Sequence, residues 1–342
     1  MVQNIIVALG AGLASALLFV VPAKGTMGAA MIGFFAPLPV MIAGLAFTPA
    51  TALIGAFAGA AGSALVLHPL PAAIFALWAA LPAWWLTRLA WLARPAQEGE
   101  NASPDGLVWY PAERLVLWSA AWAGAVTAVF LLAGVLRFGG FAEFYAAMHE
   151  ALTAAFERLL KLPNAPKTPK GMNAGEMATF ALRMVLPHIA AWGCLMLTLN
   201  IWLAGRIAQT SQRLKRPWTD IAATLRLPQN MAYVLAAALA LAMFTGGLPR
   251  TIGAIAAAAC GMAFALQGFA VMHAVSRGLR NRTLNLTMIY MLNIFLYPVP
   301  LVLTALFGAA DSFLDFRGRF QRPPRNPPPG SSGWPPPPAN SN

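Results

Sequence analysis

Long apolar segments recur along the chain and are separated by short polar stretches. Nine of them stay apolar over about 20 residues, the length that a helix needs to cross a bilayer. They cover residues 5–21, 28–47, 50–67, 70–92, 114–136, 177–204, 230–246, 251–275 and 284–310. None alternates apolar and polar positions as the strands of a membrane barrel do. The pattern predicts an all-α fold, a polytopic transmembrane helical bundle of about eight to nine spans over residues 1–320.

Prolines interrupt two of these segments. Pro37 and Pro39 lie inside the second, and Pro298 and Pro300 lie inside the last. Proline removes a backbone donor and clashes with the preceding turn, so it kinks or ends a helix. The second segment is therefore predicted to begin as a loop, residues 28–36, ahead of a short helix. The last segment is predicted to be one kinked span.

Three polar stretches and a tail separate or follow the apolar segments. The stretches are residues 93–113, 137–176 and 205–229, and the tail is residues 321–342. The middle stretch begins with an amphipathic pattern at about 138–162. Its apolar face comprises Phe141, Phe144, Tyr145, Met148, Leu152, Phe156, Leu159 and Leu160, and its polar face Glu143, Glu150, Glu157, Arg158 and Lys161. Such a helix is expected to lie in the membrane interface, with packing over the bundle as a lid as the alternative. The tail is rich in proline and is predicted to be disordered and cytoplasmic.

Charge predicts how the bundle is oriented. The chain carries 23 Lys and Arg against 11 Asp and Glu, and most basic residues lie between apolar segments. Because cytoplasmic loops concentrate Lys and Arg, the N-terminus is predicted to be cytoplasmic, together with Arg277, Arg280 and Arg282. Nine crossings would then leave Arg317 and Arg319 outside, which favours eight crossings. A secretory signal begins with Lys or Arg ahead of its apolar run, and no such residue precedes the first apolar segment here. We therefore predict that this segment is retained and that the protein resides in a bacterial inner (cytoplasmic) membrane.

Composition agrees with this class of protein. Hydrophobic residues make up 59% of the chain and charged residues 10%, whereas soluble domains carry about 25% charge. The mean hydropathy is +0.64. A soluble globule, a disordered chain and a nucleic-acid-binding domain are excluded, the last despite the net charge of +12. The predicted partner is the lipid bilayer, not nucleic acid.

Signals for catalysis or metal binding are scarce. The first acidic residue is Glu98, and none lies centrally in an apolar segment, which argues against a carboxylate relay or a sodium site. GxxxxGK[ST], HExxH and GxSxG motifs do not occur. Cys194 and Cys260 lack metal-ligand spacing, and the four histidines are distant in sequence. No metal, no cofactor and no enzymatic activity are predicted.

A few polar residues inside the apolar segments are candidates for lining a solute site. They are Arg183, His188, Asn200, Gln267, His273, Tyr290 and Asn293. Tyr290, Asn293 and Tyr297 recur at helical spacing and would share one face. The alternative is that these groups form hydrogen bonds between helices, typically worth ~0.6 kcal/mol each.

Two short motifs concern packing. The first is a stripe of small residues, Ala8, Gly12 and Ala16, which lets helices approach closely, by default within the chain. The second comprises Asp311, Asp315, Arg317 and Arg319. Asp315 and Arg319 are one turn apart and are predicted to pair, and the nearby arginines should keep both acids ionised. This second motif is predicted to be a structural or partner-docking clamp.

The closing residues resemble a known family. The run Leu296-Tyr-Pro-Val-Pro-Leu301 and the later Gly308-Ala-Ala-Asp-Ser-Phe-Leu-Asp-Phe-Arg-Gly-Arg319 look like the end of the YybS-like bacterial membrane proteins, whose function is unknown. The run Phe35-Ala-Pro-Leu-Pro39 with Thr48-Pro49 also resembles early helices of the substrate-binding S components of energy-coupling-factor transporters. That likeness implies that the loop after the first helix helps to cover a solute site. It also implies that Ala8, Gly12 and Ala16 dock a coupling membrane protein.

Two function classes follow from the sequence. The first is a transport-related protein that binds a small solute among its helices. The second is a non-transporting assembly or regulatory protein that acts through its cytoplasmic loops and tail. A pocket of several hundred cubic ångströms lined by Arg183, His188, Gln267 or Asn293 would favour the first, and a bundle packed without a cavity the second.

Overall fold

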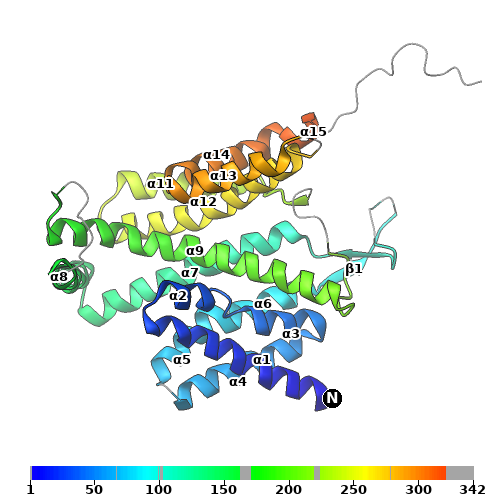
Figure 1. Cartoon of the computed structure of the whole chain (residues 1–342), viewed down its shortest axis with the longest axis horizontal. Coiled ribbons are helices and arrows are strands. Elements are labelled where there is room, and N and C mark those ends of the chain that lie inside the picture. Colours follow the sequence, from blue (N-terminus) through cyan, green and yellow to red (C-terminus); the bar gives the residue numbers. More distant parts are fainter. Residues whose placement is uncertain are drawn as a thin grey trace, which may run out of the picture.

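The computed structural model describes residues 2–320, except 67, 99, 101–102, 162–170, 219–223 and 278, and these residues are almost entirely helical (Figure 1). In this part of the chain the strands are β1 (Ala93–Pro95) and β2 (Leu107–Trp109), which pair as one short antiparallel hairpin. The all-α prediction is confirmed. The predicted tail at 321–342 lies outside the described residues.

The helices follow the predicted segments closely. They are α1 (Val2–Val20), α2 (Met27–Gly33), α3 (Leu38–Ala46), α4 (Pro49–Val66), α5 (Pro69–Phe75), α6 (Leu81–Ala90), α7 (Ala112–Phe138), α8 (Phe141–Leu160), α9 (Ala174–Thr210), α11 (Asn230–Phe244), α12 (Gly247–Val275), α13 (Arg282–Phe295), α14 (Val299–Leu314) and α15 (Phe316–Phe320). The 3-10 turn η1 (Val21–Lys24) follows α1, and the π-helical segment η2 (Ala76–Ala80) joins α5 to α6.

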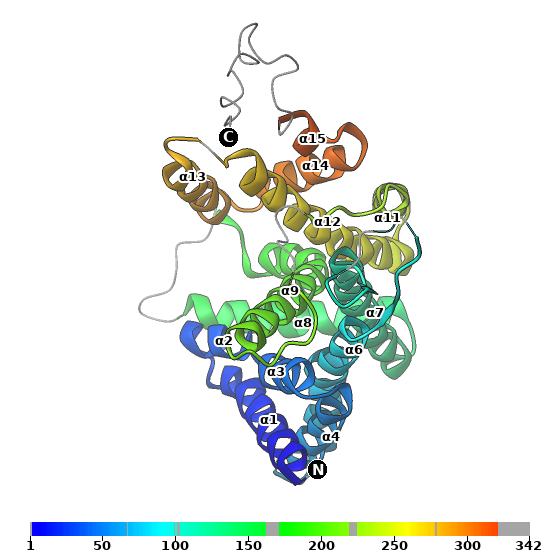
Figure 2. The ribbon, with the colours of Figure 1, turned by 90° about the vertical axis from the view of Figure 1, so that its right-hand side faces the viewer.

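Seven helical stretches of the described residues are long and apolar enough to cross a membrane. Two of them are composite: Gly28–Ala46 contains α2 and α3, and Pro69–Ala90 contains α5, η2 and α6. The chain is therefore a multi-pass integral membrane protein. The long helix α9 lies at its centre, with α1–α6 on one side and α11–α15 on the other (Figure 2).

Glycines let the helices on both sides pack closely. A Cβ at Gly12 would lie 2.0 Å from the carbonyl oxygen of Gly55, so α1 and α4 touch backbone to backbone. On the other side a Cβ at Gly308 would lie 2.0 Å from the carbonyl oxygen of Phe264, where α14 crosses α12. Ala8, Gly12 and Ala16 are buried within this packing. The stripe is used for packing within the chain, and the role in docking a coupling protein that the resemblance implies stays a prediction.

The second predicted segment differs in detail from its prediction. Residues 28–36 are not a loop, because α2 forms there with a cap in which the Thr26 hydroxyl accepts from the amide of Ala29 at 3.2 Å. The break comes later, at Phe34–Pro37. The carbonyl of Phe34 accepts from Asn200 Nδ2 at 2.8 Å, and that of Ala36 accepts from the Ser15 hydroxyl. A broken helix is tolerated at membrane depth because other side chains satisfy its backbone.

The last predicted segment is two helices rather than one kinked span. The chain turns at Tyr297–Pro298, so α14 runs back toward the end where α13 began (Figure 1). Ser312 near the end of α14 donates to the carbonyl of Leu227, just before α11. Since α11 and α12 form a tight antiparallel pair, α14 ends on the side where α11 begins. Besides the seven long stretches, α11 and α14 are shorter apolar helices among the described residues, and α13 and α14 form a helical hairpin.

Helix α8 lies crosswise to α7 and α9, and Figure 1 shows it end-on at the end of the molecule opposite β1. Its predicted polar face is exposed, and its apolar face is half-buried against α9 and α7, apart from the exposed Leu159. The amphipathic prediction for 138–162 is confirmed in the described residues 141–160. A helix with this orientation and polarity suits the membrane interface.

Candidate functional site

A cleft of about 490 Å³ opens between α9 and the region where α1 turns into α2. It is lined by Phe19, Pro22, Ala30, Gly33, Phe34, Ala36, Trp78, His188, Ile189, Trp192, Gly193 and Met196. Its volume falls in the range of about 300–1,000 Å³ that is typical of small-molecule sites. This is the pocket that we refer to as the cleft.

Irregular backbone gathers around the cleft. The break between α2 and α3 supplies Gly33, Phe34 and Ala36, and the π-helical η2 supplies Trp78. The widened turn of η2 leaves the carbonyl of Leu77 to accept from Trp122 Nε1 at 2.8 Å. π-Helical turns of this kind are frequent at functional sites. The cleft thus lies where two membrane segments depart from α-helical geometry.

Four aromatic rings dominate the walls. The rings of Phe34 and Trp192 meet edge to face with centroids 6.3 Å apart. Trp78 packs against Gly193, where a Cβ would come within 2.9 Å of its ring. Trp192 is 49% exposed and lies at the mouth of the cleft. The lining therefore offers flat apolar surfaces and, apart from one imidazole, no titratable side chain.

His188 is the polar group of the cleft. Its Nδ1 lies 2.8 Å from the carbonyl of Met184, which can only accept, so Nδ1 carries the proton. Its Nε2 and the hydroxyl of Tyr297 share a hydrogen bond of 2.6 Å. This bond ties the turn between α13 and α14 to the cleft. The Tyr297 oxygen keeps acceptor capacity for a further donor.

The other candidate solute-lining residues lie elsewhere. Asn200 secures the break after α2, and Arg183 is exposed on α9 outside the lining of the cleft. His273 Nε2 lies 2.7 Å from the Tyr290 hydroxyl, which joins α12 to α13. Asn293 donates to the carbonyl of Ile289 within α13. Asn200 and the His273–Tyr290 pair thus form hydrogen bonds between elements, as the alternative expects. The predicted shared face of Tyr290, Asn293 and Tyr297 is wrong, because Tyr297 lies beyond the end of α13.

The aromatic lining was not identified from the sequence. Phe19, Phe34, Trp78 and Trp192 come from four elements that are far apart along the chain. Two signals were available: Phe34 adjoins the Pro37 and Pro39 interruption, and Trp192 lies one turn beyond His188. Neither signal reports which elements meet in space.

The acidic and basic motif at the end of α14 forms a buried clamp. Asp311 and Arg317 pair at 3.3 Å, and their side chains are 0% and 4% exposed. Gln267 bridges two elements: its Nε2 donates to Asp311 at 3.2 Å, and its Oε1 accepts from the amide of Leu227 at 2.8 Å. The Arg317 guanidinium also donates to the carbonyl of Leu225. The clamp joins α12, α14, α15 and the segment before α11, so Gln267 belongs to it rather than to a solute site.

Asp315 takes part in a separate, exposed pair. It pairs with Arg226, not with Arg319 as predicted. Asp315 lies at the turn between α14 and α15 in the left-handed conformation, with φ of 46°, and its side chain accepts from the amide of Gly318 and from Arg226. The amide of Gly318 and the guanidinium of Arg226 lower the pKa of the Asp315 carboxyl.

The end of the molecule that carries β1 holds several basic residues and tryptophans, and we call it the basic end; its residues include Arg94, Arg213, Lys215, Arg216, Trp91, Trp109 and Trp218. Arg216 is buried there and donates to the carbonyls of Ala90 and Tyr110, both at 3.1 Å. Burial lowers its pKa to about 10. The Lys215 ammonium lies 5.3 Å from the centre of the Trp91 ring. These contacts fix the segment after α9 to the ends of α6 and β2.

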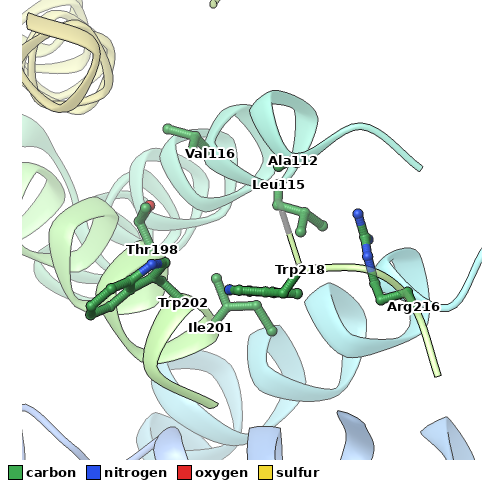
Figure 3. A pocket seen from close by; sticks show the side chains of 8 residues that line it. All are labelled: Ala112, Leu115, Val116, Thr198, Ile201, Trp202, Arg216 and Trp218. Carbon is green, nitrogen blue, oxygen red and sulfur yellow. The ribbon is translucent and has the colours of Figure 1, made fainter. Parts of the chain in front are cut away.

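A small cavity beside Arg216 is shown in Figure 3. Arg216 and Trp218 lie on one side of it, and Thr198 and Trp202 come from α9 on the other. Its volume is about 20 Å³, room for about one water molecule. A solute of organic size does not fit, so the cleft remains the candidate site. Among the described residues, no three His, Cys, Asp or Glu side chains group closely enough to hold a metal ion.

Comparison of the chain with protein-family models, with curated proteins and with solved structures finds no match.

Proposed function

We propose that this membrane protein binds a small, uncharged, flat organic solute in the cleft and that it is a transport-related component. The observation that carries the proposal is a cleft of about 490 Å³ that combines aromatic walls with one imidazole, His188. Aromatic surfaces bind flat rings, and a single polar group orients them. A charged solute would find no counter-charge among the described residues of the lining.

The broken membrane helices favour transport over a purely structural role. Secondary transporters place their substrates near the midplane, where discontinuous helices meet. Here the break at Phe34–Pro37 lines the cleft, and the break at Tyr297–Pro298 reaches it through His188. The segment after the first helix also contributes Pro22 and Ala30 to the lining. A covering role for this segment is what the likeness to transporter S components implies.

The proposal includes an orientation. We infer that the basic end faces the cytoplasm of a bacterial cell and that the protein resides in the inner membrane, because Lys and Arg concentrate on the cytoplasmic side. The N-terminus and the end of α14 then share that side. It requires that the seven long stretches and α11 cross the membrane and that α13 and α14 form a re-entrant hairpin, which is part of the proposal.

Retention of a solute tests the binding proposal. The full chain is purified in mild detergent from cells that express it, and small molecules are extracted and identified by mass spectrometry. The wild type should retain an uncharged organic compound. Ala30→Trp, which fills the cleft from its exposed side, should lose it. Ala64→Trp is the matched control, because Ala64 is exposed on α4 away from the cleft, and it should retain the compound.

Two results would contradict the proposal. One is that the wild type and Ala30→Trp retain the same set of compounds. The other is that neither retains any compound while a partner protein co-purifies with both, which would favour an assembly or regulatory role. The proposed role in transport is tested separately by measuring uptake of the identified compound. Uptake should fall in cells carrying Ala30→Trp and not in cells carrying Ala64→Trp.

A further inference from the structure

A second, apolar groove of about 510 Å³ runs along the outside of the bundle between α7, α11 and α12. Its lining comprises Leu117, Ala120, Ala121, Gly124, Ala125, Ala128, Pro228, Asn230, Met231, Val234, Ile252, Ile255, Ala256, Ala259 and Cys260. Small residues of α7 and α12 form its floor, where a Cβ at Gly124 would lie 3.5 Å from that of Ala259. The groove is distinct from the cleft, because no residue lines both.

The length of the groove matches one leaflet of the bilayer. Its α7 wall extends from Leu117 to Ala128, which at 1.5 Å per residue is about 16 Å. The hydrocarbon core is about 30 Å thick, so the groove is roughly half as deep as the membrane. A transmembrane helix of a second copy would need a seat along the full thickness. A lipid acyl chain needs only its own leaflet.

Polar groups lie beyond the end of the groove on the side of the basic end. Arg114 lies one helical turn before Leu117 on α7, is exposed, and lines a neighbouring cavity beside Tyr110 rather than the groove itself. Its guanidinium lies 5.8 Å from the centre of the Tyr110 ring, and within the described residues no hydrogen bond or ion pair of this guanidinium occurs. Asn230 lines the groove from the other wall, at the first residue of α11. Both elements begin on the side of the basic end.

From this geometry we propose that the groove binds an anionic phospholipid of the leaflet at the basic end. One acyl chain lies between α7, α11 and α12, and the phosphate lies between Arg114 and Asn230. Arginine binds phosphate through charge-assisted hydrogen bonds, and basic pockets at the ends of membrane helices suit anionic head groups. A zwitterionic lipid carries a cationic group beside its phosphate, and the basic side chains at this end would repel that group. An anionic lipid is therefore favoured. The proposal does not depend on the function of the cleft.

Native mass spectrometry of the delipidated full chain tests the proposal. Phosphatidylglycerol and phosphatidylcholine with the same acyl chains are added separately, and bound lipid is counted. The wild type should bind one phosphatidylglycerol more tightly than phosphatidylcholine. Arg114→Gln should weaken phosphatidylglycerol binding about fivefold, the effect of one basic residue near a membrane surface. Arg88→Gln, at an exposed arginine of the same end, is the matched control and should leave binding unchanged.

A second pair of variants tests the groove itself. Ala125→Leu fills the groove and should reduce phosphatidylglycerol binding at least tenfold, whereas Ala240→Leu, at an exposed site on α11 outside the groove, should not. Undiminished binding by Ala125→Leu would overturn the proposal. So would equal competition by soluble glycerophosphoglycerol, which would indicate a phosphate site that needs no acyl chain. A dimer that Ala125→Leu dissociates would show that a second copy fills the groove.

Discussion

Two acids of one motif, four residues apart, have different roles at the residue scale. Asp311 is buried and pairs with the equally buried Arg317, whereas Asp315 and its partner Arg226 are about half exposed. Removing one partner of a buried pair leaves a buried charge uncompensated, which costs about 3–5 kcal/mol. Exposed pairs are worth about 0–1 kcal/mol.

The first prediction follows from this contrast. Asp311→Asn should lower the free energy of unfolding by about 3 kcal/mol, and Asp315→Asn by less than about 1 kcal/mol. Denaturant titration of the purified protein in detergent measures both. An equal decrease in the free energy of unfolding for both variants would contradict the prediction that the buried pair contributes more than the exposed pair.

The second prediction concerns the partner of Asp315. Asp315→Arg places a positive charge beside Arg226, and folded protein in the membrane should decrease. Adding Arg226→Asp should restore it, because the pair is re-formed with reversed charges. Adding Arg319→Asp instead should not restore it, although Arg319 is the partner that helical spacing predicts. Quantitative immunoblotting of membrane fractions distinguishes the two rescues.

The third prediction is the pH dependence of this exposed pair. The amide of Gly318 and Arg226 lower the pKa of Asp315 below its ordinary value near 3.8. A carboxyl whose pKa is lower in the folded state stabilises the fold above the unfolded pKa, and this contribution is lost as the pH falls through the folded pKa. The stability difference between wild type and Asp315→Asn should be constant from about pH 8 to 5, begin to decrease near about pH 4, and vanish only when the pH falls below the lowered pKa of the folded state. A difference that persists in acid would assign the effect to packing.

At the scale of elements, α1 and α4 can approach closely because glycines lie where they cross.

The fourth prediction compares two glycines of α1. Gly12→Ala places a methyl group 2.0 Å from the carbonyl oxygen of Gly55, and should destabilise the protein by about 1–3 kcal/mol. Gly10→Ala meets no atom within 4 Å, and should be neutral or stabilising by up to about 1 kcal/mol. Melting temperatures in the same detergent test the pair, and a similar decrease for both would contradict it.

The sequence predicted most elements because apolar length alone identifies a membrane helix. The loss of backbone donors at Pro37 and Pro298 predicted that the helices are interrupted there. It did not predict the conformation of the chain at either interruption. The Thr26 cap made α2 a helix where a loop was expected. The turn after Tyr297 reversed the chain where a kink was expected. Both outcomes depend on partners such as Asn200 and His188, which are distant in sequence.

The cleft was predictable only in part, because its lining residues are distant in sequence and meet only in the folded chain. His188 was a candidate because a polar group inside an apolar segment is unusual. Aromatic residues are ordinary in such segments, so Phe19, Trp78 and Trp192 gave no signal until the fold brought them together.

At the scale of the whole molecule, the proposed orientation places both Arg277 and Arg319 on the cytoplasmic side of the membrane. The fifth prediction is that Arg277→Cys and Arg319→Cys, each in a background without Cys194 and Cys260, resist an impermeant thiol reagent added to intact cells and react after permeabilisation. Glu150→Cys, on the exposed face of α8 at the opposite end, should react in intact cells. Labelling of Arg319→Cys from outside while Arg277→Cys stays protected would instead mean that α13 and α14 cross as one span.

The central claim is that the cleft holds a solute among broken helices. A cryo-electron microscopy map of the full chain, purified from its cells and placed in lipid nanodiscs without added ligand, tests this claim most directly. We predict a compact density that belongs to neither protein nor lipid, in the cleft beside the rings of Trp78 and Trp192 and near His188. A cleft closed by α2, or filled by acyl-chain density continuous with the surrounding bilayer, would contradict the claim.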